Sequence, residues 1–181
     1  MFEELLEKTA LELDSKGIPY MVIGGQAVLL YGEPRLTRDI DITLGVGVEQ
    51  AEEIIAMARD IGLEPLPSDV IGLIMEAMVL PTIDEPSGIR VDFIFSQSSY
   101  ERAAIGRVRR VRIGKTEVCF TSLEDLIIHK VVAGRPRDIE DLKAVIAKNP
   151  EYDRDYISKW LEEFDSALDT EFRKAFDALD G

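Results

Sequence analysis

The 181-residue chain has very few of the residues that build covalent cross-links and zinc sites. Its one cysteine, Cys119, excludes an internal disulfide framework. Its one histidine, His129, has no second ligand type beside it, so a zinc site of histidine and cysteine can hardly be assembled. Metal chemistry in this chain must therefore use oxygen ligands, which favours Mg²⁺ or Mn²⁺ over zinc.

Long apolar runs are also missing, although 46% of the residues are hydrophobic. No run approaches the ~20 residues that a membrane-spanning helix needs, so we expect no membrane partner. The N-terminal stretch MFEELLEKTALELDSKG is acidic and amphipathic, unlike a signal or transit peptide. We expect a soluble, cytoplasmic protein with one domain of ordinary size, or one domain with a small appendage.

Basic residues are fewer than acidic ones, with 21 Lys and Arg against 35 Asp and Glu, so the formal net charge is -14. Such a chain repels the nucleic-acid backbone on average, which argues against wholesale DNA binding. One local basic segment exists, made up of Arg107, Arg109, Arg110, Arg112 and Lys115. It suits an RNA or protein acceptor, or a solvated strand pair that balances charge, and the sequence favours the second interpretation.

Apolar periodicity predicts an α/β (α+β) protein with a core over residues 1–120 and a helical C-terminal part over 121–181. Glycine and proline breaks at 134–136 and 149–150 divide the helical part. The predicted helices of the core are 2–16, 26–31 and 49–61, and its predicted strands are 20–23, 39–44, 76–83, 89–95, 108–113 and 116–120.

A glycine pair, Gly24-Gly25, ends the first predicted strand and precedes a helix. Glycine lacks a Cβ, so backbone N–H groups at this position can approach an anion closely. The following helix N-terminus adds partial positive charge and free N–H donors. The pair suits a phosphate chain, and a plain tight turn is the alternative that the pair alone leaves open.

Two aspartates, Asp39 and Asp41, alternate with apolar residues on the strand 39–44. Alternation places both carboxylates on one face, with Cα atoms ~6.5–7 Å apart. Carboxylates at this spacing can converge on a pair of metal ions about 3.5–4 Å apart. Aspartate is depleted in strands, so we interpret the pair as a metal site and not as an exposed edge.

A third carboxylate, Asp92, lies on the predicted strand 89–95, on the face opposite Ile89, Val91, Phe93 and Phe95 and between Arg90 and Ile94. An isolated aspartate in such a strand is costly unless it is paired or bound to a metal. Asp92 is therefore a candidate third ligand, and a local ion pair with Arg90 is the alternative.

Two basic residues, Arg38 and Lys130, are candidates for contact with an anion. Arg38 directly precedes Asp39 and either contacts phosphate or compensates the aspartates. Lys130 shares a helix face with the apolar residues Leu126 and Ile127. A lysine in this position either snorkels to the surface or meets an anion.

Taken together, these residues resemble the polymerase-beta-like nucleotidyltransferase superfamily. Its signature is a strand, Gly followed by Gly or Ser, about a dozen residues, Asp-x-Asp or Asp-x-Glu, and a later carboxylate. Here thirteen residues separate Gly25 from Asp39. The string Gly-Gly-x-Ala, followed by Arg35-x-Thr37-x-Asp39-x-Asp41, looks most like the branch of the abortive-infection type IV toxins. Lys130, Arg137-Asp138 and Asp141-Leu142 are similar to that branch's C-terminal pattern.

This resemblance implies a small mixed sheet flanked by helices and a Mg²⁺-dependent transfer of a nucleoside monophosphate from an NTP, with release of pyrophosphate. It implies that Asp39, Asp41 and Asp92 bind the metal and act in catalysis, and that Gly24, Gly25, Arg38 and Lys130 bind the nucleotide, with ATP a candidate. The acceptor is RNA such as tRNA, protein or a small molecule, and the implied protein partners are a second copy or a cognate antitoxin. The alternative is a non-catalytic nucleotide- or partner-binding module of a toxin–antitoxin-like system.

Overall fold

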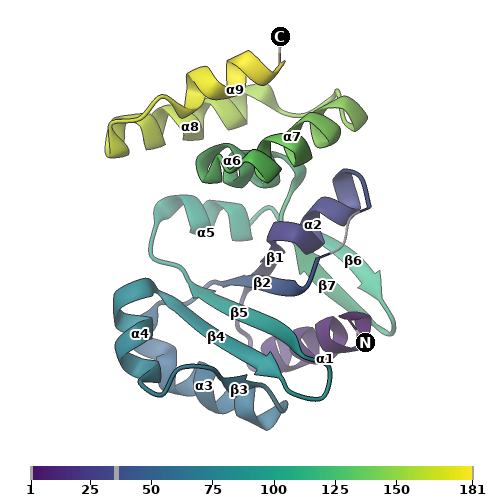
Figure 1. Ribbon diagram of the computed structural model, residues 1–181, viewed down its shortest axis with the longest axis vertical. Coiled ribbons are helices and arrows are strands. Elements are labelled where there is room, and N and C mark those ends of the chain that lie inside the picture. Colours follow the sequence, from purple (N-terminus) through teal and green to yellow (C-terminus); the bar gives the residue numbers. More distant parts are fainter. Residues whose placement is uncertain (1, 35–36, 181) are drawn as a thin grey trace. The chain divides into compact units, whose positions relative to one another are not determined.

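The computed structural model of the protein describes residues 2–34 and 37–180 (Figure 1). Arg35 of the sequence motif lies outside these residues. The chain divides into two compact units, one made of Met1–Gln26 and Thr37–Thr121, the other of Ala27–Leu36 and Ser122–Gly181. The division passes through helix α2 (Gly24–Tyr31), so this helix contributes to both units.

Within its described residues, the first unit is built on a seven-stranded mixed sheet with the order β3-β4-β5-β2-β1-β7-β6. β1 pairs in parallel with β7, and β2 pairs in parallel with β5, whereas the other neighbouring pairs are antiparallel. The strands are β1 (Tyr20–Ile23), β2 (Asp39–Leu44), β3 (Glu64–Pro65), β4 (Val79–Asp84), β5 (Ile89–Phe95), β6 (Arg109–Ile113) and β7 (Thr116–Phe120).

Apolar side chains on one face of this sheet form the core of the unit. Figure 1 shows α1 (Phe2–Ser15) and α3 (Ala51–Asp60) along this face, with η1 (Val48–Gln50) leading into α3. Alternate residues of β2 and β5 point into it and are at most 2% exposed: Ile40, Ile42, Leu44, Val91, Phe93 and Phe95. A slip of one residue would move all of these side chains to the opposite face, so their burial holds the strand register. This fixed register decides which polar residues meet on the other face.

The predicted strand at 76–83 is partly wrong, because a helix occupies its beginning. The structure has α4 (Val70–Ala77) and then β4, separated by Met78 in the left-handed conformation with φ 57°. The side chain of Asp69 accepts a hydrogen bond from Gly72 N at 2.9 Å and caps the helix start. The run from Val70 to Leu80 is almost wholly apolar, and apolarity alone does not distinguish helix from strand.

Two other elements of the first unit were not predicted. Helix α5 (Ser99–Ile105) begins with a capping box, in which Ser98 and Glu101 bond each other's backbone N–H groups. The two-residue strand β3 pairs with β4 at the sheet edge. Helix α2 also begins earlier than predicted, at the glycine pair itself.

The second unit is helical, with α6 (Leu123–Ala133), α7 (Pro136–Lys148), α8 (Arg154–Leu168) and α9 (Phe172–Asp180). Gly134 ends α6 in the left-handed conformation with φ +59°, and Pro136 starts α7. Asn149 Nδ2 donates to Tyr31 O at 2.7 Å, and Lys148 Nζ donates to Gly32 O at 3.0 Å. These bonds hold the end of α2 and the residue after it against the end of α7, within this unit. No helix in the described ranges is both long and apolar enough to cross a membrane.

Candidate active site

The glycine pair lies where β1 ends and α2 begins. Gly24 has φ +63°, a conformation that residues with a side chain rarely adopt. A Cβ at this position would also collide with the Oδ2 atom of Asp41. Two independent constraints therefore require glycine at position 24. The first N–H groups of α2 have no partner within the helix, so the helix start presents donors beside an aspartate.

Strand pairing brings the predicted aspartates together. Ile23 is the register partner of Asp41 across β1 and β2, which places Asp41 beside the glycine pair. Asp41 is in turn the register partner of Asp92 across the parallel strands β2 and β5. Neighbouring strands lie ~4.8 Å apart, and the side chains of in-register partners share a face. Asp39, two residues earlier on β2, belongs to the same face.

The exposures of these residues agree with such an open face. Asp39 is exposed, and Asp41 and Asp92 are half-buried. The residues directly next to these aspartates within β2 and β5 are buried. Arg38, one residue before β2, is exposed as well. The Thr37 hydroxyl donates to Asp39 O at 3.3 Å, so Thr37 shapes the entry to the strand.

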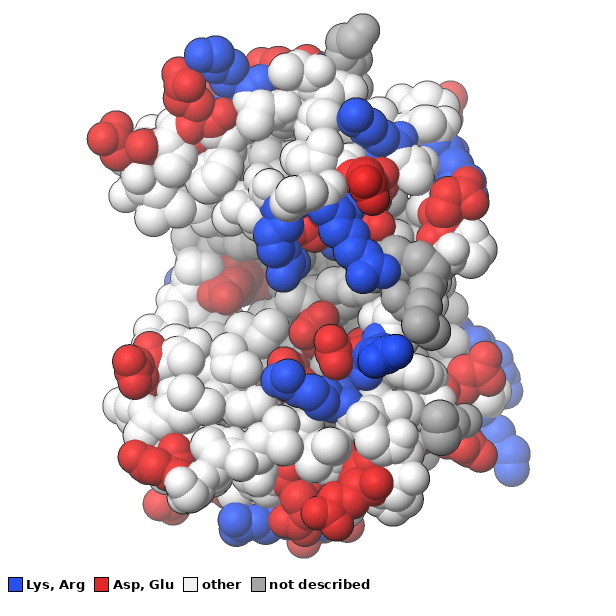
Figure 2. All heavy atoms as spheres, viewed as in Figure 1, with Lys and Arg blue, Asp and Glu red and all other residues white. Residues whose placement is uncertain are grey.

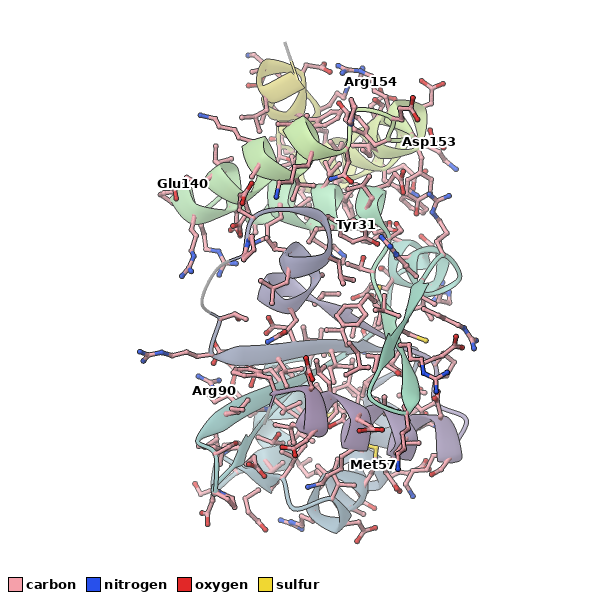
Figure 3. The ribbon with its side chains drawn as sticks, turned by 90° about the vertical axis from the view of Figure 1, so that its right-hand side faces the viewer. Tyr31, Met57, Arg90, Glu140, Asp153 and Arg154 are labelled. Atoms are coloured by element: carbon pink, nitrogen blue, oxygen red, sulfur yellow. The ribbon has the colours of Figure 1, made fainter. Side chains whose placement is uncertain are left out.

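Arg90 forms an ion pair with Asp92 on this face. Its Nη2 atom lies 3.3 Å from Oδ1 and 3.2 Å from Oδ2 of Asp92. Arg90 is also the register partner of Asp39. Figure 3 shows Arg90 near the beginning of the strands, with Met57 on the other side of the sheet. The local pairing that the sequence left open for Asp92 is thus present.

The pKa of Asp92 is raised above the usual value of an aspartate. Burial is the largest cause, and the negative charge of Asp39 adds to it. The charge and the hydrogen bond of Arg90 act in the opposite direction without cancelling the rise. A carboxylate with a raised pKa binds a proton more readily, which suits a general base.

The donor set of this face fits a hard divalent cation, because it consists of carboxylate oxygens. Among the described residues, however, no group of three or more Asp, Glu, His or Cys side chains is gathered closely enough to hold an ion. Asp92 is bonded to Arg90 instead. Asp39 and Asp41 are the residues that would hold a cation first, and Asp92 would join them after it releases Arg90.

Lys130 lies in the second unit and is buried, with 5% of its surface exposed. Its Nζ atom lies 2.6 Å from Asp138 Oδ1 and 2.7 Å from Asp141 Oδ2. Lys130 therefore does not snorkel to the surface, and the anions that it meets are carboxylates of this chain. The sequence did not identify this pairing, although both acids lie near the start of the helix that follows Lys130.

Asp138 also forms an ion pair with Arg135, whose Nε atom lies 2.6 Å from Oδ2 of Asp138. Burial raises the pKa of Asp138, but hydrogen bonds from Arg135 and Lys130 and their positive charges outweigh it, so that the net shift is downward. The cluster of Lys130, Arg135, Asp138 and Asp141 thus has two positive and two negative charges.

The mixed sheet, the glycine turn and the aspartates on one face are the features of a nucleotidyltransferase fold. A family model described as "Nucleotidyltransferase of unknown function (DUF6036)" matches residues 2–178. The chain belongs to this nucleotidyltransferase family, and the predicted superfamily, fold class and enzyme class are confirmed. None of the curated proteins searched matches the chain. The abortive-infection branch stays a prediction.

Several solved structures have a similar fold. An antigenic nucleotidyltransferase-like protein from Paracoccidioides brasiliensis has a TM-score of 0.59 at 15% identity over 98% of this chain and 91% of its own. The antibiotic-resistance factor ANT(2'')-Ia, in complex with adenylyl-2''-tobramycin, has a TM-score of 0.59 at 17% identity over 96% of this chain and 98% of its own. The lincosamide antibiotic adenylyltransferase LnuA, lincomycin-bound, has a TM-score of 0.52 at 17% identity, covering 74% and 89%. At these identities the likeness concerns the fold.

Proposed function

We propose that this protein transfers a nucleoside monophosphate from an NTP to an acceptor hydroxyl with the help of Mg²⁺ or Mn²⁺. The observation that carries the proposal is the position of Asp41. Its carboxylate lies against the backbone of Gly24 on one side, and its register partner on the other side is Asp92. The proposed phosphate site, the proposed metal ligand and the proposed base would thus follow one another across three neighbouring strands.

The triphosphate would bind at the start of α2. Backbone N–H groups at Gly24 and Gly25 donate hydrogen bonds to its oxygens, and the helix dipole favours the negative charge. Arg38 is exposed beside Asp39 and supplies a positive charge to the same anion. Lys130 stays a predicted nucleotide ligand, and a phosphate would have to compete with Asp138 and Asp141 for its ammonium group.

A divalent cation held by Asp39 and Asp41, and by Asp92 after its release from Arg90, would neutralise charge that develops on the phosphates. The acceptor oxygen attacks the α-phosphorus in line with the leaving group. The bond between that oxygen and phosphorus forms while the bond from phosphorus to the bridging β-phosphate oxygen breaks. Pyrophosphate leaves with the electron pair, and Asp92 takes the proton of the attacking hydroxyl or positions it.

The acceptor belongs to one of three classes, namely RNA, protein or a small molecule. The structure of LnuA with bound lincomycin and that of ANT(2'')-Ia with adenylyl-2''-tobramycin support a small molecule as acceptor for folds of this kind. A non-catalytic binding module is the alternative function. The presence of all three aspartates on one face argues against it, since mere binding does not require a base.

The experiment uses an NTP labelled at the α-phosphate, incubated with the protein, Mg²⁺ and a cell extract. The RNA, protein and small-molecule fractions are counted for label, and pyrophosphate is measured in parallel. Asp39→Asn should abolish transfer while circular dichroism shows an unchanged fold. Asp60→Asn, at an exposed position of α3, is the matched control and should remain active. Full transfer by the Asp39 variant would show that the mechanism is wrong.

A further inference from the structure

The sheet face of the three aspartates continues onto β4 as an apolar surface. Across β4 and β5, Pro81 is the register partner of Asp92, and Ile83 is the register partner of Arg90. Val79 and Ile94 form the next pair of register partners on this face. These four apolar residues, which we call the apolar shelf, are Val79, Pro81, Ile83 and Ile94. They lie beside Asp92 on the face that carries the proposed chemistry.

The apolar shelf is not part of the core of the unit. Leu80 and Thr82, which alternate with the shelf residues along β4, are 0% exposed and face the core. All four shelf residues are instead half-buried, so apolar atoms remain accessible to a ligand. Figure 2 shows mostly uncharged surface over β4 and α4. Accessible apolar surface next to a polar site is typical of ligand-binding sites.

The order of the strands assigns a direction to the reaction. Phosphates at Gly24 lie over β1, the aspartates lie on β2 and β5, and the shelf follows on β5 and β4. In-line displacement requires the acceptor oxygen and the leaving pyrophosphate on opposite sides of the α-phosphorus. The pyrophosphate side is the side of β1, so the acceptor approaches from β5 and β4. The distance from β1 to β4 is three strand spacings, or ~14 Å, which suits a small ligand.

We propose that the apolar shelf is the acceptor subsite, and that the acceptor is a small, uncharged, hydroxyl-bearing molecule with an apolar or aromatic face. This inference rests on the proposed nucleotidyl transfer. The ring of Pro81 presents a rigid apolar surface directly beside Asp92, and Ile83 and Val79 extend it along β4. A flat ligand on this surface would hold its hydroxyl group within reach of the Asp92 carboxylate.

Charge argues against a nucleic-acid acceptor at this subsite. A polyanion needs cations around its path, but β4, the strand with three of the four shelf residues, contains no lysine or arginine. Across β3 and β4, the register partner of Ile83 is an acid, Glu64. The basic strand β6, with Arg109, Arg110 and Arg112, forms the opposite edge of the sheet, beyond β1. An acceptor on β4 therefore cannot use it.

The test compares Ile83→Ser with Ile113→Ser. Ile113 is also a half-buried isoleucine near the end of a strand, but it lies on β6, at the far edge of the sheet from β4. The probes are a panel of uncharged aryl glycosides and nucleosides, whose binding is followed by saturation-transfer NMR without NTP. We expect at least one probe to bind, with Ile83→Ser weakening it by about tenfold and Ile113→Ser leaving it unchanged. In labelled transfer to that probe, Ile83→Ser should raise KM for the acceptor and leave KM for the NTP as it was.

Other outcomes overturn the inference. Failure of the whole panel to bind, or equal weakening by both substitutions, would exclude the apolar shelf as the subsite. Label that enters only RNA or protein, with pyrophosphate release, would preserve the nucleotidyl transfer and refute the small-molecule acceptor. Ile83-dependent binding without any pyrophosphate release would leave the shelf as a binding surface and refute the transfer itself.

Discussion

Gly24 and Asp41 lie in such close contact that no residue with a Cβ fits at position 24 without displacing the Asp41 carboxylate. The contact joins the first residue of α2 to β2, although the rest of α2 and the segment that follows it separate the two in the sequence. It results from the antiparallel register in which Ile23 faces Asp41. The glycine thus positions a candidate metal ligand in addition to opening the backbone to an anion.

Gly24→Ala should therefore destabilise the protein by about 2–4 kcal/mol, since left-handed strain and a steric clash add. Gly88→Ala is the matched control. Gly88 has φ +70°, but nothing lies within 4 Å of a Cβ built there, so only the strain of about 1 kcal/mol applies. Urea denaturation of both variants measures the difference. Equal losses would mean that the Gly24–Asp41 contact relaxes without cost.

Arg90→Ala should shift the pH dependence of transfer upward. The charge and hydrogen bond of Arg90 lower the pKa of Asp92, so their removal raises a pKa that burial has already raised. The base is then deprotonated only at higher pH, and the rising limb of kcat/KM moves with it. Arg112→Ala, at an exposed position of β6, should leave the profile unchanged. A downward shift for Arg90→Ala would contradict the assignment of Asp92 as base.

Lys130→Met should destabilise the protein by about 3–5 kcal/mol. The substitution leaves Asp138 and Asp141 buried without the ammonium that bonds both of them, and removing one partner of a buried ion pair is strongly unfavourable. Lys143→Met, at an exposed position of helix α7, which carries both acids, should change the free energy of unfolding by less than about 0.5 kcal/mol. Denaturant titration at pH 7 gives both values. A small loss for Lys130→Met would show that the acids find other partners.

The pKa of Asp138 predicts a loss of stability in acid. Because this pKa is lower in the folded protein than in the unfolded chain, the unfolded chain takes up the proton first. The contribution is present above the ordinary aspartate value of about 3.9, and it is lost as pH falls through the lowered folded value. Asp138→Asn should reduce this loss of stability in acid when the free energy of unfolding is measured between about pH 5 and pH 2. The control Asp60→Asn, on α3, should lose stability in acid as the unsubstituted protein does. The same loss in Asp138→Asn would show that Asp138 does not cause it.

The strands that carry the candidate site follow from local pattern. The predicted ranges 20–23, 39–44 and 89–95 agree with β1, β2 and β5, since apolar runs and alternation are properties of neighbouring residues. The same reasoning failed at 76–83, where an apolar segment begins as α4 and continues as β4. It also left the partner of Asp92 open, because the choice between Arg90 and a metal depends on what surrounds the carboxylate.

By itself, the sequence determined which residue types are present for chemistry, namely carboxylates in place of a histidine and cysteine set, and a glycine pair at the end of a strand. Only the tertiary structure decided that Asp41 and Asp92 are register partners, that Lys130 is bonded to Asp138 and Asp141, and that an apolar shelf adjoins Asp92. The physical reason is that these relations join distant segments. The pairing of Asp41 with Asp92, for example, is held by the burial of Ile40, Ile42 and Phe93 on the opposite face of the sheet, which fixes how β2 and β5 align.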